Sequence, residues 1–221
     1  NKKISIPIIP ILIAIAVVVV FVIILITRGT EDGLSKLSKV YEKMISNQTY
    51  IFARYDFEEK NKLTTYRKAD KTLIDMNNSG EHLSTLIVEG DTYLIFHENK
   101  EYYVYPNNNS NEEELLTKNI KNIIDLEYTT GKEKIYGKTY KYEEYNGVSD
   151  FLISSPKNMD TNSIKTRFYF KGNELMYLKT IYDVVDEETG ERTQNEELQT
   201  VNVKYEVEDS IFEIRSDYAE N

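Results

Sequence analysis

The sequence predicts one α+β domain in which a largely antiparallel sheet holds two helices against one face, preceded by a single N-terminal transmembrane helix. Three observations support this fold class. The first 30 residues contain a long apolar run, two later segments space their apolar residues as one face of a helix does, and the rest alternates in short segments between turn residues. The 18 tyrosines and 8 phenylalanines also favour sheet.

The N-terminal run, residues 4–26, is apolar apart from Ser5, Pro7 and Pro10. At a rise of 1.5 Å per residue, a helix of this length reaches roughly 34 Å, which is enough to cross a bilayer. Lys2 and Lys3 precede the run, so the positive-inside rule places the N-terminus in the cytoplasm.

A cleaved signal peptide is the alternative interpretation of this run. Its apolar core would be about 7–15 residues long and would end at a small-x-small site. Here the only such pattern, Ala14-Ile15-Ala16, lies inside the run, so an uncleaved anchor is favoured. The prediction is a single-pass protein of the cell membrane, divided into a cytoplasmic stub (1–3), a transmembrane signal anchor (4–27), a linker (28–33) and an extracytoplasmic domain (34–221).

The domain opens with a helix predicted over 34–47, because its apolar residues share one face. Turn residues rich in Asn, Gly and Asp then separate six expected strands, at 48–58, 62–68, 72–77, 82–89, 92–97 and 101–105. The capping box of Ser110 and Glu113 begins a second helix that runs to about residue 126. Five further strands are expected at 133–135, 138–145, 166–171, 175–185 and 198–207, with a polar loop at 154–163 and a last apolar segment at 211–214.

Charge and composition exclude several classes of function. Residues 31–221 carry 24 basic and 37 acidic side chains. A domain this acidic repels phosphate, so we expect no nucleic-acid partner and no peripheral binding to anionic lipid. The absence of cysteine excludes disulfides, thiolate metal sites, a thiol nucleophile and a lipidated N-terminal Cys.

Signals of catalysis are weak. The two histidines, His82 and His97, have no HExxH motif and no evident third ligand, so strand or surface positions are favoured over a zinc site. The acidic stretch 183–191 is interpreted as a solvated hairpin tip rather than a calcium site. No nucleophile-elbow or phosphate-loop motif occurs, and nothing selects a glycosidase pair among the many carboxylates, although such a pair stays open. We therefore predict no enzyme, no catalytic residue, no metal and no cofactor.

Four segments carry a family resemblance: the strand QTYIFARYDFE (48–58), the hairpin 90–106, the segment GKTYKYEEY (137–145) and the ending IFEIRSDY (211–218). Together with the opening helix, they resemble the LolA/LolB-like superfamily of outer-membrane lipoprotein carriers over about residues 34–218. The resemblance implies a strongly curved sheet, an incomplete β-barrel, with helices packed on its concave face and an apolar cavity between. Family members carry acyl chains or other lipids, or have become protein-binding modules.

The aromatic residues are the remaining clue to function. Ordinary cross-strand packing is one explanation for them. The other is that the inward members line an apolar cavity for an acyl chain, for which strand alternation selects Phe52, Phe96, Phe168 and Phe170. The sequence thus predicts a membrane-anchored, extracytoplasmic, non-catalytic module that holds a lipid, acyl chain or lipoprotein. The alternative is an envelope protein-interaction module, cell-wall or sporulation-related, that has the same fold, takes no lipid and binds through its sheet edge or acidic face.

Overall fold

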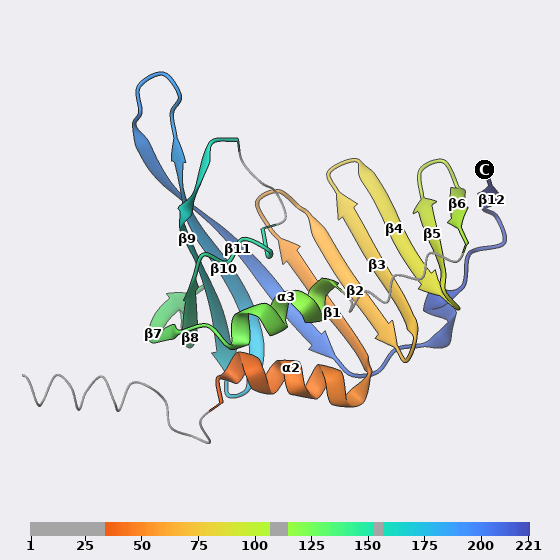
Figure 1. Ribbon diagram of the computed structural model, residues 1–221, viewed down its shortest axis with the longest axis horizontal. Coiled ribbons are helices and arrows are strands. Elements are labelled where there is room, and N and C mark those ends of the chain that lie inside the picture. The colour runs from red at the N-terminus through yellow and green to blue at the C-terminus, as the bar shows by residue number, and fades with distance from the viewer. Residues whose placement is uncertain (1–33, 107–114, 153–156) are drawn as a thin grey trace, which may run out of the picture. The chain divides into compact units, whose positions relative to one another are not determined.

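A single continuous sheet dominates the computed structural model, which describes residues 34–106, 115–152 and 157–221 (Figure 1). Its strand order is β12-β6-β5-β4-β3-β2-β1-β11-β10-β9-β8-β7. The helical elements are α2 (Lys36–Asn47), α3 (Leu115–Ile124) and the short 3-10 helix η1 (Asp209–Phe212). The strands are β1 (Thr49–Asp56), β2 (Lys62–Lys68), β3 (Lys71–Asn78), β4 (Glu81–Val88), β5 (Asp91–Phe96), β6 (Glu101–Tyr105), β7 (Tyr128–Ile135), β8 (Lys138–Asn146), β9 (Met159–Lys171), β10 (Glu174–Val185), β11 (Arg192–Lys204) and β12 (Ala219–Glu220).

The predicted fold class is wrong in its architecture. The structure is a mainly β fold built on a large open sheet, in place of an α+β domain with an incomplete barrel. The reason lies in the pairing of β1 with β11, from which β2–β6 extend in one direction and β10–β7 in the other. The outermost strands β12 and β7 therefore stand at opposite ends of the sheet. The sheet is also mixed, because β12 runs parallel to β6.

Tight turns explain most of the strand boundaries. The β4–β5 connection is Glu89-Gly90, with φ of 55° and 87°, and the β7–β8 connection is Tyr136-Gly137, with φ of 46° and 80°. Positive φ at both central residues is the backbone of the two-residue hairpin turn that matches the twist of the flanking strands. Antiparallel pairing extends from each turn, and the two-residue turn sets the register of the two strands that it joins.

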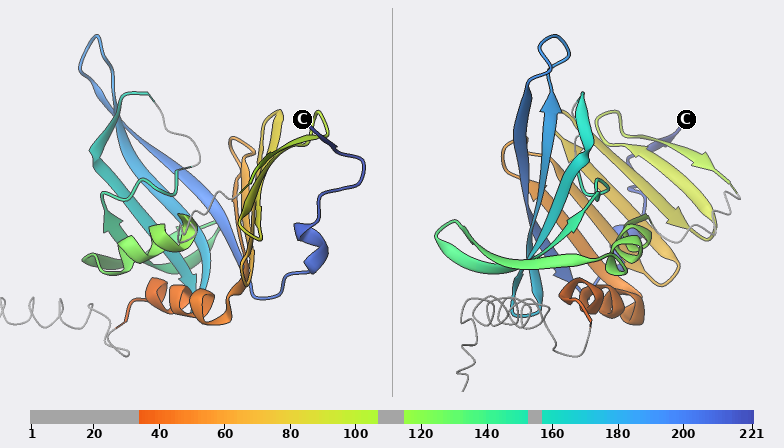
Figure 2. Two further views of the ribbon diagram at one scale, coloured as in Figure 1. Left: turned by 45° about the vertical axis from the view of Figure 1, so that its right-hand side comes forward. Right: turned by 60° about the vertical axis from the view of Figure 1, so that its left-hand side comes forward.

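The helices and the C-terminal segment cover opposite faces of the sheet. The left view of Figure 2 shows α2 and α3 on one side of the sheet and the blue C-terminal segment on the other. On the helix side lies the main core, to which α2 contributes Leu37 and Met44 and α3 contributes Ile120 and Ile123, each at most 2% exposed. On the other side, Val207 and Phe212 cover Leu86 and Ile95 in a smaller second core.

A buried carboxylate from the sheet holds the start of α2. Glu143 of β8 accepts hydrogen bonds from the backbone N–H groups of Lys36 (2.6 Å) and Leu37 (3.1 Å), and from the hydroxyl of Tyr145 (3.3 Å). These first N–H groups have no partner inside the helix, and a carboxylate also interacts favourably with the positive end of the helix dipole. Burial nevertheless raises the pKa of Glu143 above its usual range, although the two backbone N–H groups act against the rise.

The described residues include no helix with the length and apolar character needed to cross a bilayer. Helices α2 and α3 have 12 and 10 residues, so they reach only roughly 18 and 15 Å, against about 30 Å of bilayer hydrocarbon. The predicted single-pass location in the cell membrane is corrected to this extent: the part of the chain that the structure describes contains no membrane-spanning helix. The segments assigned to the stub (1–3), the anchor (4–27) and the linker (28–33) lie outside the described residues, as does the capping box at Ser110.

Candidate functional site

The four phenylalanines proposed as cavity-lining residues all lie on the helix-covered face, as the strand registers show. Phe52, Phe168 and Phe170 belong to the main core, with exposures of 2%, 0% and 3%. Their neighbours are the side chains of α2 and α3 and of Phe151, whose ring meets that of Phe168 edge-on at 5.4 Å. These three rings are thus packed among protein side chains.

Phe96 lies apart from the other three. It stands at the end of β5, is half-buried, and packs edge-on against Tyr103 of β6 with ring centroids 5.7 Å apart. The structure therefore brings together three of the four selected residues and places the fourth near the far end of the sheet. Their role as ligand-binding residues stays a prediction.

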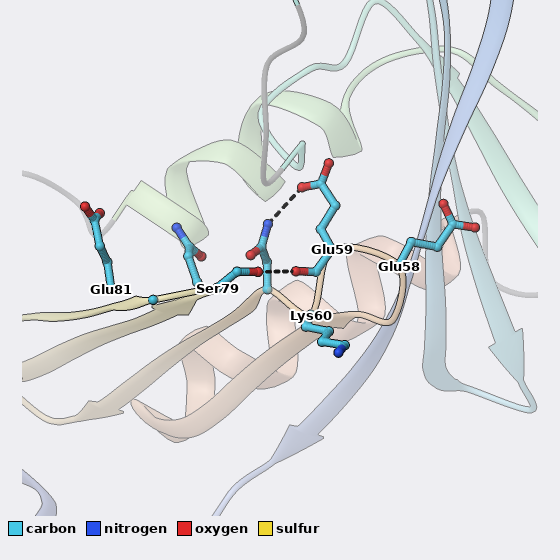
Figure 3. A pocket seen from close by; sticks show the side chains of 8 residues that line it. Glu58, Glu59, Lys60, Ser79 and Glu81 are labelled. Carbon is cyan, nitrogen blue, oxygen red and sulfur yellow. Dashed lines mark hydrogen bonds between the residues drawn. The ribbon is translucent and has the colours of Figure 1, made fainter.

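None of the four phenylalanines lines either of two hollows that lie on the surface of the described part of the chain. The larger, of about 860 Å³, lies between the β1–β2 and β3–β4 turns and is lined by Glu58, Glu59 and Glu81 beside Lys60 (Figure 3). The hydroxyl of Ser79 donates to the carbonyl of Glu59 at 2.8 Å and ties the two turns together. No apolar side chain lines this hollow, so it does not suit an acyl chain.

The second hollow, of about 640 Å³, lies between α2 and the sheet. Val40 and Lys43 of α2 line one side, and Leu175, Val203 and Tyr205 line the other. The ammonium group of Lys43 lies over the ring of Tyr205 at 4.0 Å. The lining of this hollow therefore contains both apolar and polar groups.

A cluster of polar side chains lies on the opposite face, where β3, β4 and the end of β5 run side by side. Asp75 accepts from Nε2 of His82 (2.7 Å) and from the hydroxyl of Ser84 (2.8 Å). Nε2 of His97 lies 2.7 Å from that hydroxyl, and its Nδ1 lies 2.8 Å from the hydroxyl of Tyr218. The two imidazole rings stack, with centroids 3.8 Å apart and an interplanar angle of 18°. We call Asp75, His82 and His97 the His–Asp cluster.

One arrangement of protons satisfies every contact of the cluster. Tyr218 donates to His97 Nδ1, His97 donates from Nε2 to Ser84, and Ser84 donates to Asp75. Since the Ser84 proton points at a carboxylate and not at a basic imidazole nitrogen, this is not a serine–histidine nucleophile pair. Burial, followed by the neighbouring His82, lowers the pKa of His97.

The sequence indicates no third ligand beside the two histidines, whereas the structure supplies Asp75. The ligating atoms of Asp75, His82 and His97 all lie within 4.8 Å of one another. The hairpin turn between β3 and β4 was the sequence feature that could have indicated Asp75 as the third ligand. It sets Asp75 opposite Ser84, two residues from His82 and on the same face of the sheet.

A group of aromatic side chains lies on the same face of the sheet as the His–Asp cluster, over the other half of the sheet. We call Tyr55, Phe57, Tyr136, Tyr140 and Tyr177 the aromatic platform. Successive ring centroids lie 4.7 Å (Tyr55 to Phe57), 6.4 Å (Phe57 to Tyr136), 6.2 Å (Tyr136 to Tyr177) and 5.1 Å (Tyr177 to Tyr140) apart. Phe57 is 52% exposed and Tyr136 is 69% exposed. Burial and the hydrogen bond with Tyr140 raise the pKa of Tyr177.

An ion-pair network fixes the strands beside the platform. Glu133 accepts hydrogen bonds from Lys179 (2.7 Å), Arg167 (2.8 Å) and the hydroxyl of Tyr169 (2.6 Å). Burial alone would raise the pKa of Glu133, but these hydrogen bonds outweigh it and lower the pKa. Burial and the Glu133 carboxylate raise the pKa of Tyr169 in turn. Each group is held in its ordinary protonation state, which suits a rigid support rather than acid–base catalysis.

A second buried polar group stands on the helix side. Arg54, 6% exposed, donates to the carbonyl of Phe151 at 2.7 Å, and its guanidinium lies 5.3 Å from the Phe151 ring. Burial lowers the pKa of Arg54 to about 10, although the charge of Glu197 acts in the other direction. Arg54 therefore stays a cation at neutral pH and fixes the loop that carries Phe151 against the sheet.

The acidic stretch 183–191 contains the solvated hairpin tip between β10 and β11. Asp186 accepts hydrogen bonds from the backbone N–H groups of Glu188 (3.0 Å) and Thr189 (2.7 Å), which closes the turn on itself. These backbone N–H groups lower the pKa of Asp186. Residues 186–190 are all exposed.

Comparisons with known proteins give little further information. No protein-family model matches the chain, and no curated protein matches it. Among solved structures, it is similar to an uncharacterized conserved protein from Thermus thermophilus, at 9% sequence identity and a TM-score of 0.42. That similarity covers 85% of this chain and 100% of the other, and at this TM-score it carries no argument. None of these results supports the LolA-like resemblance or lipid binding, and the open sheet contradicts the barrel that the resemblance implies.

Proposed function

We propose that this domain is a non-catalytic protein-binding module that takes an extended segment of a partner along the edge strand β7. The observation that carries the proposal is the position of β7 at one end of the open sheet, next to the aromatic platform. Strand β7 pairs only with β8 among the described residues, so the outer backbone N–H and C=O groups of its second half, residues 132–135, can pair with an added strand.

The platform supplies the apolar half of the recognition surface. Its residue Tyr136 forms part of the turn that ends β7, and Phe57 and Tyr177 continue the aromatic surface across the sheet. Tyrosine and phenylalanine are enriched at protein interfaces because they bury a large area at a small cost in side-chain entropy. Every second residue of an added strand would face this side of the sheet.

The other face of the β7–β8 hairpin is basic, although the whole chain has a net charge of −10. Lys132 and Lys141 stand opposite each other, and Lys134 lies toward the turn on the same face. All three are exposed. The remaining residues of an added strand would lie beside these lysines. The surface therefore fits an extended acidic segment in which aromatic or aliphatic residues alternate with Glu or Asp.

Gly131 lies in the edge strand β7 and has no side chain that could hinder an added strand. A side chain at this position would collide with the ring of Tyr142 from β8, which covers the strand here. An aromatic ring over an edge glycine is a known way to stabilise an edge strand. The edge is thus held in an extended conformation without a bulky side chain of its own.

The experiment uses an eight-residue peptide alternating Phe or Leu with Glu, and fluorescence anisotropy with the full chain. We expect saturable binding that weakens as salt increases, with amide shifts confined to β7, β8 and the platform. Reversing the charge at Lys132 and Lys134 together, or Tyr136→Ala, should each weaken binding about tenfold or more. The matched control for Tyr136→Ala is Tyr105→Ala, because Tyr105 is exposed and belongs to β6, near the other end of the sheet.

Two results would contradict the proposal. One is equal binding of the peptide with Lys in place of Glu, and the other is unchanged affinity after Tyr136→Ala. Lipid binding in an apolar cavity stays a prediction that no observation here favours, since the three clustered phenylalanines are packed against protein.

A further inference from the structure

We propose that the His–Asp cluster is a binding site for a divalent transition-metal ion, with Zn²⁺ as the expected occupant. The site lies in the half of the sheet away from β7, and its argument is independent of the proposed peptide binding. Its three ligands would be Nε2 of His82, Nε2 of His97 and the Asp75 carboxylate. Two imidazoles and one carboxylate form a donor set that Zn²⁺ prefers, with room left for water or an external donor.

The backbone presents these ligands from a rigid frame. Asp75 stands opposite Ser84 across the β3–β4 pair, and His82 lies two residues before Ser84 on the same face. The backbone N–H of His97 donates to the carbonyl of His82 at 3.1 Å, which sets the two rings side by side across β4 and the end of β5. Asp75 and His82 are carried on paired strands, which position side chains more accurately than loops. His97 directly follows β5 and is held by this backbone hydrogen bond.

Entry of a metal ion requires the two histidine rings to turn, because they stack nearly parallel and the lone pair of each nitrogen lies in the plane of its ring. The separation between His82 and Asp75 needs to change only a little. In the structure, Nε2 of His82 and Oδ1 of Asp75 are hydrogen-bonded at 2.7 Å. Around a tetrahedral zinc ion, with ligands about 2.0–2.1 Å from the metal, neighbouring donor atoms are about 3.3 Å apart. A separation increase of roughly half an ångström therefore converts the hydrogen bond into a pair of ligands. The metal replaces the shared proton once both imidazoles carry their proton on Nδ1.

The surroundings contain the partner that a metal-binding histidine needs. Ligating imidazoles generally donate their second N–H to an oxygen atom, which fixes the orientation of the ring. The hydroxyl of Tyr218 lies 2.8 Å from Nδ1 of His97 and can accept that hydrogen bond in the metal-bound tautomer. Tyr218 also meets the His97 ring edge-on at 5.6 Å, so the C-terminal segment closes one side of the site.

Solvent can reach the cluster. The side chain of His82 is 34% exposed and that of Asp75 is 19% exposed. An ion can thus enter without opening of the main core, which lies on the other face of the sheet. Ser84, which is 2% exposed, lies beneath the ligands and holds Asp75 in place through its hydroxyl.

The test is calorimetric titration of the full chain, first stripped of metal with a chelator, with Zn²⁺ alone. We expect one ion per chain with a micromolar or tighter Kd. Saturation should raise Tm by roughly 5 °C, because the ion binds only the folded state. With Co²⁺ in place of Zn²⁺, the visible absorption of a tetrahedral or five-coordinate ion should appear.

Variants identify the ligands. His82→Ala and His97→Ala should each lose about 100-fold or more in affinity, and Tyr218→Phe, which keeps the ring, should lose about tenfold. Asp70→Asn is the matched control for Asp75→Asn, because it changes an exposed carboxylate in the β2–β3 turn. Zn²⁺ binding to the wild-type protein should also shift the ring resonances of both histidines, a measurement that needs no variant.

Three results would overturn the proposal. They are the absence of saturable 1:1 binding, undiminished affinity in both His→Ala variants, and histidine resonances that do not respond to Zn²⁺. Any of these would leave the cluster as a hydrogen-bonded network that only stabilises the sheet.

Discussion

Two halves of one sheet are stabilised in different ways. Around β1 and β8–β11, helices α2 and α3 cover the sheet and 16 buried apolar side chains form the main core. Around β3–β6, the covering layer is the C-terminal segment with η1, and the second core has four buried apolar side chains on the opposite face. A helix buries a continuous apolar stripe, whereas an extended segment contributes only isolated residues, so the second half has the thinner layer.

The difference extends to the polar groups. In the helix-covered half, the buried Arg54 and Glu143 have partners that fix a loop and a helix to the sheet. In the second half, His82, His97 and Asp75 lie at the border of the small core, where solvent reaches them. The comparison shows that binding groups can be accommodated where packing is sparse, because their desolvation costs less there. The predictions below test this contrast.

The largest effect should come from the main core. Phe168→Ala removes a fully buried ring and should lower the free energy of unfolding by about 3–5 kcal/mol. The measurement is urea denaturation followed by circular dichroism. A loss below about 1 kcal/mol would mean that the helices do not pack on Phe168 as described.

Phe212→Ala tests the second core. The ring is 6% exposed and packs in the small cluster, so we expect a loss near the lower end of the same range, about 3 kcal/mol. Hydrogen exchange should show where the loss falls. Amides of β3–β6 should exchange faster while those of β9 and β10 stay protected. Uniformly faster exchange would show that the two halves unfold as one unit.

Sequence patterns predict the hairpins of one half of the sheet better than the long strands of the other half. Alternation and turn residues predicted β1–β6 to within about two residues at each end, because Asn-, Gly- and Asp-rich turns define those hairpins locally. The first halves of β9 and β11 were missed, and part of β9 was assigned to a polar loop. Residues 160–163 of β9 and 192–197 of β11 are all polar and lie beyond the main core, so alternation gives no signal there.

Long-range pairing was not predictable from local patterns. Closure into a barrel would require β7 to pair with β6 or β12. Which strands stand at the two ends of the sheet depends on the pairing of β1 with β11, which lie far apart in the chain. The last apolar segment, 211–214, was expected to end the fold. It begins inside η1 and contributes Phe212 and Ile214 to the second core, and β12 follows it. For the site, the two histidines were noticed, but Asp75 became a partner only once the β3–β4 register was known.

A smaller effect is expected where the sheet holds the start of α2. Glu143→Ala leaves two backbone N–H groups without their acceptor, so we expect a loss of about 1–2 kcal/mol, as for other helix caps. The reduced protection in hydrogen exchange should be confined to α2 and its neighbours. Glu144→Ala, on the opposite face of β8, is the matched control for position, and it should leave the protection of α2 unchanged.

The smallest effect is a pH dependence at the same residue. Because the pKa of Glu143 is raised in the folded state, folding favours its protonated form, and the associated stability is present below the unfolded pKa. That stability is lost as the pH rises through the raised, folded-state pKa. Glutamine does not titrate, so the free energy of unfolding of the wild type minus that of Glu143→Gln should fall as the pH increases from 4 to 7. A difference that grows with pH would show that the hydrogen bonds from α2 outweigh burial at this carboxylate.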